Sequence, residues 1–129
     1  MPEIRQAEVR NWIRKVAAEH GKTTGDITFL FCDDERILEV NQKYLQHDYF
    51  TDIITFDYST GNLISGDLFI STDTVSTNAI QFGTEFEHEL LRVIIHGVLH
   101  LCGFSDSTSE DRSKMTELEN RALHLLTSL

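Results

Sequence analysis

The sequence predicts an α+β fold: a single domain in which a small mixed β-sheet packs with about five helices, one of them central and buried. The chain has 129 residues, the length of one domain with one core. Hydrophobic residues make up 40% of it, enough to form that core without disulfides. Segments with helical and strand-like apolar spacing are interspersed, and no repeat or linker divides them. Residues 1–129 are therefore expected to form one domain.

The first part of the chain is expected to form two helices and one strand. Residues 3–20 carry apolar side chains at near-helical spacing, which predicts an amphipathic helix. Residues 26–32, "DITFLFC", are β-branched and aromatic, which predicts a buried strand. Residues 33–45 begin with acids that favour a helix N-terminus, so they predict a second helix. One side of that helix carries Ile37, Val40, Asn41 and Tyr44.

Two strand-like runs and a short helix follow. Residues 52–58, "DIITFDY", and 62–71, "NLISGDLFIS", are separated by a brief turn and predict a hairpin or adjacent strands. Gly66, inside the second run, indicates a bulge or a close approach of another backbone. Residues 72–82 are then expected to form a short helix.

The last part of the chain predicts two longer helices. Residues 84–102 form one helical run that is apolar on nearly every face beyond Leu90, which is typical of a central buried helix. Gly103 is placed to end it in a left-handed conformation. Ser107 and Glu110 have the spacing of a capping box for the final helix. The apolar stripe of that helix consists of Met115, Leu118, Ala122 and Leu125.

Charge and cysteine content limit the possible functions. A net charge of −10 argues against a non-specific nucleic-acid binder, so an RNA substrate would need a local positive patch or a metal. Cys32 and Cys102 belong to no CxxC pair, which favours free thiols. No apolar run reaches the ~18 residues of a membrane helix and the N-terminus is charged throughout, so we expect a cytoplasmic protein. The one basic cluster, interpreted as the solvated face of the first helix, comprises Arg5, Arg10, Arg14 and Lys15.

Two histidines inside the apolar run 94–106, "IIHGVLHLCGFSD", indicate a metal site. His96 and His100 are four residues apart, so a helix places both imidazoles on one face. Gly103 permits a sharp turn, after which Asp106 can fold back beside the helix. This is the ligand spacing of metzincin zinc sites, with an acid in the third position. Three such ligands plus a water suit a catalytic zinc, which predicts one zinc per chain. The alternative is two core histidines that share helical spacing by chance.

The same spacing lacks the catalytic residue of a peptidase. Zinc peptidases carry a glutamate general base directly after the first histidine, whereas this chain has Gly97. The remaining histidines are weaker candidates: His88 is interpreted as a solvated residue of a first helical turn, and His20 and His124 as residues near helix ends. His47 lies in a loop, where functional residues concentrate, and stays a candidate catalytic residue.

Three further residues have two readings each. Asp67 is the second candidate catalytic residue, as a partner that orients a ligand imidazole, or else a structural acid that holds a bulge. Thr51 and Asp52 are either caps at a strand start or substrate contacts. Cys102 follows His100 by two residues, so it points to the other side of the helix and is expected in the core.

The stretch "HGVLHLCGFSD" resembles the signature H-G-x-L-H-L-x-G-[YF]-D-H of the YbeY family, the metal-dependent endoribonucleases of rRNA maturation. "TDIITF" is similar to that family's T-[ND]-[VI]-[LI]-[ST]-F segment, and "GDLFIS" to its G-D-[IL]-x-[IL] segment. The order and spacing of these segments agree from about Asn41 to Glu119. The chain is therefore identified as a member of this family.

The resemblance implies an α+β fold, a zinc held after the long helix, and cleavage of single-stranded RNA. His96 and His100 match the two helical ligands. The family's third histidine falls on Asp106, and the aspartate before it on Ser105. The family's arginine before the T-[ND] segment falls on Leu45, and the nearby residues that could replace it are Lys43 and His47.

We therefore expect a cytoplasmic, single-strand-specific zinc endoribonuclease that matures the 3′ end of small-subunit rRNA and acts in ribosome quality control. Its expected partners are rRNA and the small ribosomal subunit, and a monomer is favoured. The metal would polarise the scissile phosphate or supply a hydroxide. One alternative is a non-catalytic ribosome-assembly factor with a structural zinc, which the missing arginine and the acidic charge favour. The other is a metallopeptidase, which shares the ligand spacing.

Overall fold

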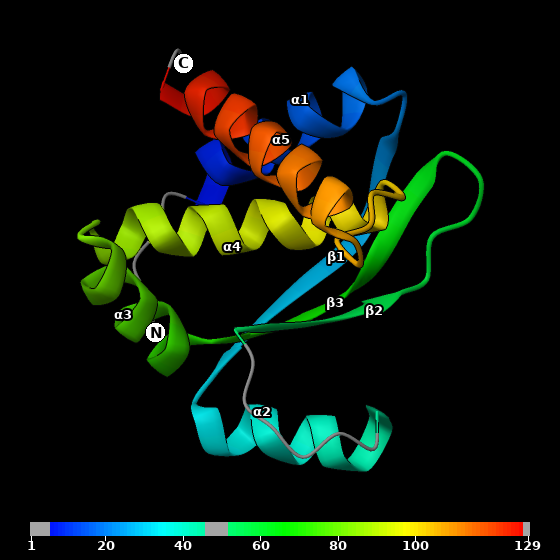
Figure 1. The fold of residues 1–129 in the computed structure, drawn as a ribbon. Coiled ribbons are helices and arrows are strands. Elements are labelled where there is room, and N and C mark those ends of the chain that lie inside the picture. The colour runs from blue at the N-terminus through cyan, green and yellow to red at the C-terminus, as the bar shows by residue number, and fades with distance from the viewer. Residues whose placement is uncertain (1–5, 46–51, 128–129) are drawn as a thin grey trace.

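The computed structural model describes residues 6–45 and 52–127 and shows an α+β fold (Figure 1). The helices are α1 (Gln6–Glu19), α2 (Asp34–Val40), α3 (Thr72–Phe82), α4 (Phe86–Leu101) and α5 (Ser109–Thr127). The strands are β1 (Thr23–Cys32), β2 (Ile53–Asp57) and β3 (Leu63–Ser71), and a π-helical segment, η1 (Asn41–Leu45), follows α2. The predicted fold class, a small mixed sheet with about five helices, is confirmed.

The sheet has the order β1-β3-β2, with β1 parallel and β2 antiparallel to the central β3. The predicted hairpin is confirmed, because β2 and β3 pair from Ile53 opposite Ile70 to Asp57 opposite Gly66. Residues 26–32 form a strand, as predicted, but the predicted burial is wrong, because every residue of β1 is exposed or half-buried. The reason is the strand order, which places β1 at the edge of the sheet.

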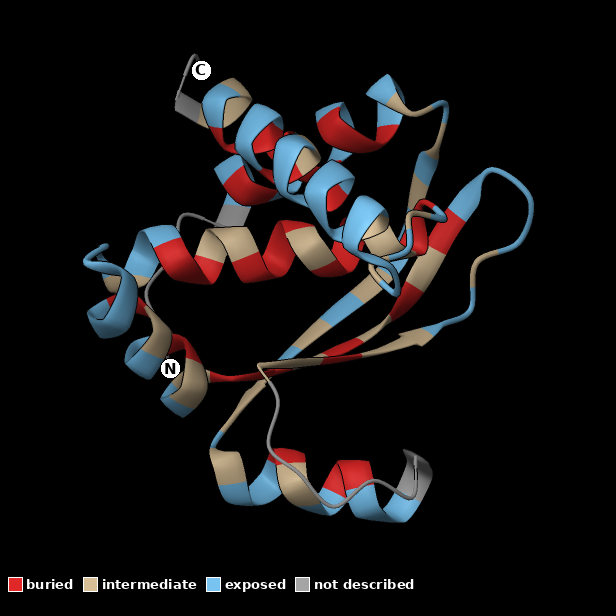
Figure 2. Cartoon of the chain, in the orientation of Figure 1, coloured by how far each residue is buried: buried red, intermediate tan, exposed pale blue. Residues whose placement is uncertain are grey.

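The core surrounds α4, with β3 on one side of this helix and α1 and α5 on the other (Figures 1 and 2). Residues of β3 alternate, and Ile64, Leu68 and Ile70 are fully buried. On the opposite face, α2 packs its Ile37 and Val40 against Ile54 in a smaller cluster. The sheet is therefore covered on both faces, by α4 with its neighbouring helices and by α2.

Helix α4 is the central element that the sequence predicts. Its buried residues are Glu89, Leu90, Val93, Ile94, Ile95, Gly97, Val98, Leu99 and Leu101. Helices α1, α3 and α5 and both strands β2 and β3 contact it. Because α4 is enclosed in this way, the groups near its C-terminal end are held rigidly against the sheet and α5.

Two glycine predictions are confirmed. A Cβ on Gly66 would lie 2.4 Å from the carbonyl oxygen of Phe56, so this glycine permits the close approach of β2. Gly103 has φ +104°, in the left-handed region that favours glycine, and its N–H donates to the His100 carbonyl at 2.9 Å. The chain leaves α4 in a tight turn as a result.

The second helix and the cap of the last helix differ from the predictions, and β1 begins at Thr23 rather than at Asp26. The predicted helix over 33–45 is an α-helix only to Val40, and its last residues form η1 with Asn41 buried; the Tyr44 side chain lies outside the described residues. The predicted capping box at Ser107 is wrong, because Thr108 Oγ1 accepts from the Asp111 N–H at 3.0 Å and caps α5. The segment 105–111 offers several capping side chains, and Ser105 and Ser107 bond to each other instead.

The basic cluster of α1 and the two cysteines lie as the sequence predicts. Arg10, Arg14 and Lys15 are exposed on α1, as expected of a solvated face, while Arg5 lies outside the described residues. Cys32 and Cys102 are free thiols, and burial raises the pKa of each. Within residues 6–45 and 52–127, no helix is both long and apolar enough to cross a membrane.

Candidate metal centre

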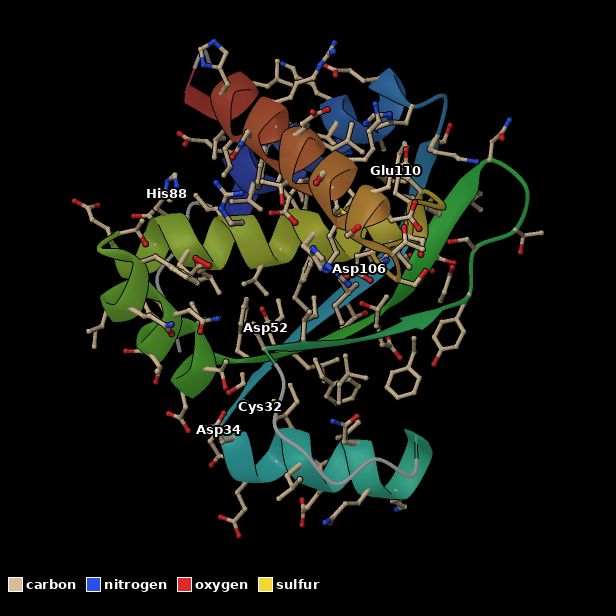
Figure 3. All side chains as sticks on the ribbon, in the orientation of Figure 1. Cys32, Asp34, Asp52, His88, Asp106 and Glu110 are labelled. Carbon is tan, nitrogen blue, oxygen red and sulfur yellow. The ribbon has the colours of Figure 1, made fainter. Side chains whose placement is uncertain are left out.

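Three side chains converge where α4 ends. The Nε2 atoms of His96 and His100 lie 3.0 Å apart. Asp106 Oδ2, from the loop after Gly103, lies 3.3 Å from the first nitrogen and 3.6 Å from the second. Figure 3 shows Asp106 near the C-terminal end of α4. The spacing of four residues, followed by the left-handed turn at Gly103, thus brings together the three residues that the sequence singled out.

The dimensions of this group fit one zinc ion. Tetrahedral zinc with bonds of about 2.0–2.1 Å separates two of its ligand atoms by about 3.3–3.4 Å. The three donor separations here, 3.0, 3.3 and 3.6 Å, bracket that value. Two imidazoles and one carboxylate are also a donor set that zinc accepts. The His96, His100 and Asp106 group is therefore able to hold a metal ion.

Hydrogen bonds fix the orientation of both imidazoles. His100 Nδ1 lies 2.9 Å from the carbonyl oxygen of Phe104, and His96 Nδ1 lies 2.6 Å from Glu119 Oε2. A carbonyl and a carboxylate only accept hydrogen bonds, so each Nδ1 carries the proton. In the neutral rings, each Nε2 then presents a lone pair to the common point. This is the arrangement that metal-binding histidines require.

Glu119 is itself held by α4. Glu119 is only 7% exposed, and its Oε1 accepts a hydrogen bond from Arg92 Nη1 at 3.0 Å. The other terminal nitrogen of Arg92 donates to Asn120 Oδ1 at 2.8 Å. Burial alone lowers the pKa of His96, but the hydrogen bond and charge of Glu119, with Asp52 and Asp106, outweigh it and raise that pKa.

The sequence alone did not point to Glu119, Arg92 or the Phe104 carbonyl. Glu119 lies on the apolar side of α5, one helical turn from Met115, where a charged residue interrupts the buried stripe. That interruption was the available signal. Arg92 and the Phe104 carbonyl left no signal of this kind, because only the fold brings them to Glu119 and His100.

The structure places Asp67 away from the two imidazoles that it was expected to orient. Asp67 lies between the buried residues Gly66 and Leu68 of β3, so its side chain points away from α4. It accepts a hydrogen bond from Tyr58 Oη at 3.4 Å. The two Nδ1 atoms that it could have oriented are bonded to Glu119 and Phe104.

The other candidates are dispersed. His47 and Thr51 lie outside the described residues, as does the Leu45 side chain. His88 is exposed in the first turn of α4, far from Asp106 (Figure 3).

His20 packs edge-on against Phe104, with ring centroids 4.8 Å apart, and burial lowers its pKa. His124 is exposed near the end of α5, and Cys102 is buried, as expected for each.

Asp52 lies just before β2, close enough to the centre to affect it electrostatically. Its backbone carbonyl accepts from the Ser71 N–H at 2.9 Å, which ties the start of β2 to the end of β3. Its charge contributes to raising the pKa of His96.

A side chain at the position after His96 would point toward the sheet in this fold. A Cβ on Gly97 would lie 2.1 Å from Leu68 Cδ2 and 2.7 Å from Ile53 Cδ1. Residue 97 therefore faces the sheet, where a larger side chain meets buried apolar groups. The peptidase mechanism lacks its general base, and a larger residue here would have to displace Leu68 and Ile53.

Fold and site together define a small α+β protein with a candidate two-histidine, one-aspartate metal centre at the end of a buried helix. A family model described as Endoribonuclease YbeY matches residues 2–127, so the chain belongs to the YbeY family. Proteins named Endoribonuclease YbeY include one from Parabacteroides distasonis, 60% identical over 126 residues, which cover 98% of this chain and 89% of that protein. The one from Bacteroides thetaiotaomicron is 59% identical over 123 residues, covering 95% and 90% of the two chains.

A solved structure has the same fold. It is the solution structure of TM1509 from Thermotoga maritima, with a TM-score of 0.66 over 97% of this chain and 85% of that one. The sequence identity of 23% is low, so this likeness concerns the fold alone.

Proposed function

We propose that this protein is a zinc-dependent endoribonuclease that cuts single-stranded RNA and matures the 3′ end of small-subunit rRNA, with a role in ribosome quality control. The relatives' printed name, Endoribonuclease YbeY, supports the reaction class. The observation that carries the proposal is the convergence of His96, His100 and Asp106 within one zinc-sized triangle. The expected location is the cytoplasm, with rRNA and the small ribosomal subunit as partners and a monomeric chain.

The chain's own residues prepare a site for one zinc ion. His96, His100 and Asp106 would hold it, and it would supply a Lewis acid that polarises the scissile phosphate or acidifies a water. Their side chains are 22%, 26% and 43% exposed, so the centre is partly open to a substrate. A carboxylate as third ligand neutralises more of the metal charge than an imidazole does. The centre is then less electrophilic than one with three histidines.

The number of ligands favours a catalytic site over a structural one. A structural zinc is usually closed by four protein ligands, whereas a catalytic zinc keeps one position open. Within the part of the chain that the structure describes, the candidate group contains three ligands and no fourth histidine, cysteine or acid. The alternative, an assembly factor with a structural zinc, requires a fourth ligand that this group does not offer.

The test compares zinc content and RNA cleavage in wild type, His100→Ala and His88→Ala. His88 is the matched control, because it lies exposed on the same helix and away from the centre. We expect about one zinc per chain in wild type and in His88→Ala, both of which should cut single-stranded RNA. His100→Ala should lose metal and activity. Wild-type protein that holds zinc but cuts no RNA would favour the assembly factor, and cleavage by metal-free protein would exclude the mechanism.

A further inference from the structure

We infer that Glu119 is a positioning residue of the metal centre. It holds His96 in the tautomer that carries its proton on Nδ1, which leaves Nε2 free to bind a metal. Arg92 in turn holds Glu119 in place. This inference rests on the proposed function, since it concerns the same centre. The residues come from separate elements, with Glu119 on α5 and both His96 and Arg92 on α4. Helix α5 therefore contributes to the site without supplying a ligand.

The two oxygens of Glu119 have different partners. Oε2 accepts from His96 Nδ1 at 2.6 Å, and Oε1 accepts from Arg92 Nη1 at 3.0 Å. The site thus needs two acceptor atoms in one buried side chain. A carboxylate provides two acceptor oxygens, whereas an amide provides one acceptor oxygen and an NH2 group that only donates. Arg92 also fixes the rotation of the carboxylate, so that Oε2 faces the imidazole.

The two ligand histidines are consequently supported by unlike groups. His100 Nδ1 is bonded to the neutral carbonyl of Phe104, which belongs to the turn after α4. His96 Nδ1 is hydrogen-bonded to a carboxylate, which makes the imidazole more basic and so a stronger ligand for a metal. The group that supports His100 is four residues away in the chain. The group that supports His96 is on another helix, so this hydrogen bond depends on the packing of α5 against α4. Glu119 therefore links the integrity of this helix pair to metal affinity.

The experiment measures the zinc affinity of wild type, Glu119→Gln and Glu117→Gln by competition with a chelator. Glu117 is the matched control, since it lies exposed on the same helix two residues earlier. We expect Glu119→Gln to bind zinc about 10- to 100-fold more weakly than wild type, the usual effect of removing such a partner. Glu117→Gln should bind like wild type. Equal affinity in all three proteins would overturn the inference.

A double variant separates positioning from a general loss of stability. In Glu119→Gln, the single amide oxygen cannot serve both Arg92 and His96. Arg92→Met removes the competing donor, so the amide oxygen becomes available to His96. We therefore expect Arg92→Met/Glu119→Gln to recover part of the zinc affinity that Glu119→Gln loses. A double variant that binds zinc no better than Glu119→Gln would contradict the two-acceptor argument.

A measurement on metal-free wild type and metal-free Glu117→Gln makes the test independent of the RNA reaction. Nitrogen–proton correlation spectra of the imidazoles at about pH 9, where histidine is neutral, report which ring nitrogen carries the proton. We expect His96 to carry it on Nδ1 in wild type and in Glu117→Gln. A wild-type His96 protonated on Nε2 would refute the role of Glu119. Absence of RNA cleavage would instead refute the proposed function and leave this result standing.

Discussion

Gly97 lies against Leu68 so closely that a Cβ on the glycine would be 2.1 Å from Leu68 Cδ2. This contact limits how near α4 lies to the sheet, one residue after the candidate ligand His96. Leu68 is fully buried, so its side chain has little room to move away. The glycine is thus a packing requirement of the helix that carries the candidate metal centre.

Gly97→Ala should lower the free energy of unfolding by about 1–3 kcal/mol, the usual cost of overpacking a core. The double variant Gly97→Ala/Leu68→Ala should lose less than the sum of the two single variants, since the smaller residue at 68 admits the new methyl group. Urea denaturation of the four proteins gives this comparison. Additive losses would mean that the contact with Leu68 does not limit residue 97.

Ile94→Asp should prevent folding rather than only inactivate the protein. Ile94 is 0% exposed in the middle of α4. An unpaired carboxylate there costs several kcal/mol, comparable to the whole stability of a small domain. His88→Asp, at an exposed position of the same helix, is the control and should melt near the wild-type temperature. A cooperative melt of Ile94→Asp close to that of wild type would show that the helix is not the core.

Asp106 and Thr108 should have separable roles. Asp106→Ala should weaken zinc binding strongly because it leaves only the helical pair, and Asp106→His should retain zinc because an imidazole is also a suitable ligand. Thr108→Ala removes the cap of α5 and should cost about 1 kcal/mol of stability without loss of zinc. Chelator competition and urea denaturation on each variant distinguish the two. Unchanged zinc affinity in Asp106→Ala would remove this residue from the centre.

The sequence predicted those elements, and brought together those candidate ligands, whose signals are local. The central helix, the hairpin and the turn at Gly103 each show in a continuous run of residues. The three candidate ligands also lie within eleven positions, 96–106, so helical geometry and one glycine suffice to bring them together. The prediction of the site depended on no knowledge of the sheet.

What the sequence did not predict depends on which elements become neighbours. The exposure of β1 follows from the strand order, which strand propensity does not determine. Glu119 lies 23 residues beyond His96, and only the packing of α5 on α4 joins them. Asp67 looked like a suitable acid, but the two-residue period of β3 turns it to the other face.

Glu89→Gln should stabilise the protein at neutral pH. Glu89 is 5% exposed, and burial raises the pKa of its carboxyl, an effect that the charge of Arg92 partly offsets. A raised folded pKa means that folding favours the protonated form. The stability that this group contributes is therefore fully present below its unfolded pKa, about 4.3, and is lost as the pH rises through the folded pKa. Glutamine stays neutral and should avoid that loss.

Urea denaturation of wild type, Glu89→Gln and Glu87→Gln from about pH 4 to pH 7 tests this expectation. The advantage of Glu89→Gln over wild type should be small at the acid end and grow toward neutral pH. Its size should be about 1.4 kcal/mol for each pH unit that separates the folded and unfolded pKa values. Glu87, exposed in the first turn of α4, is the control and should show no such growth. A constant difference between Glu89→Gln and wild type across this range would show that Glu89 ionises as readily in the folded protein as in the unfolded chain.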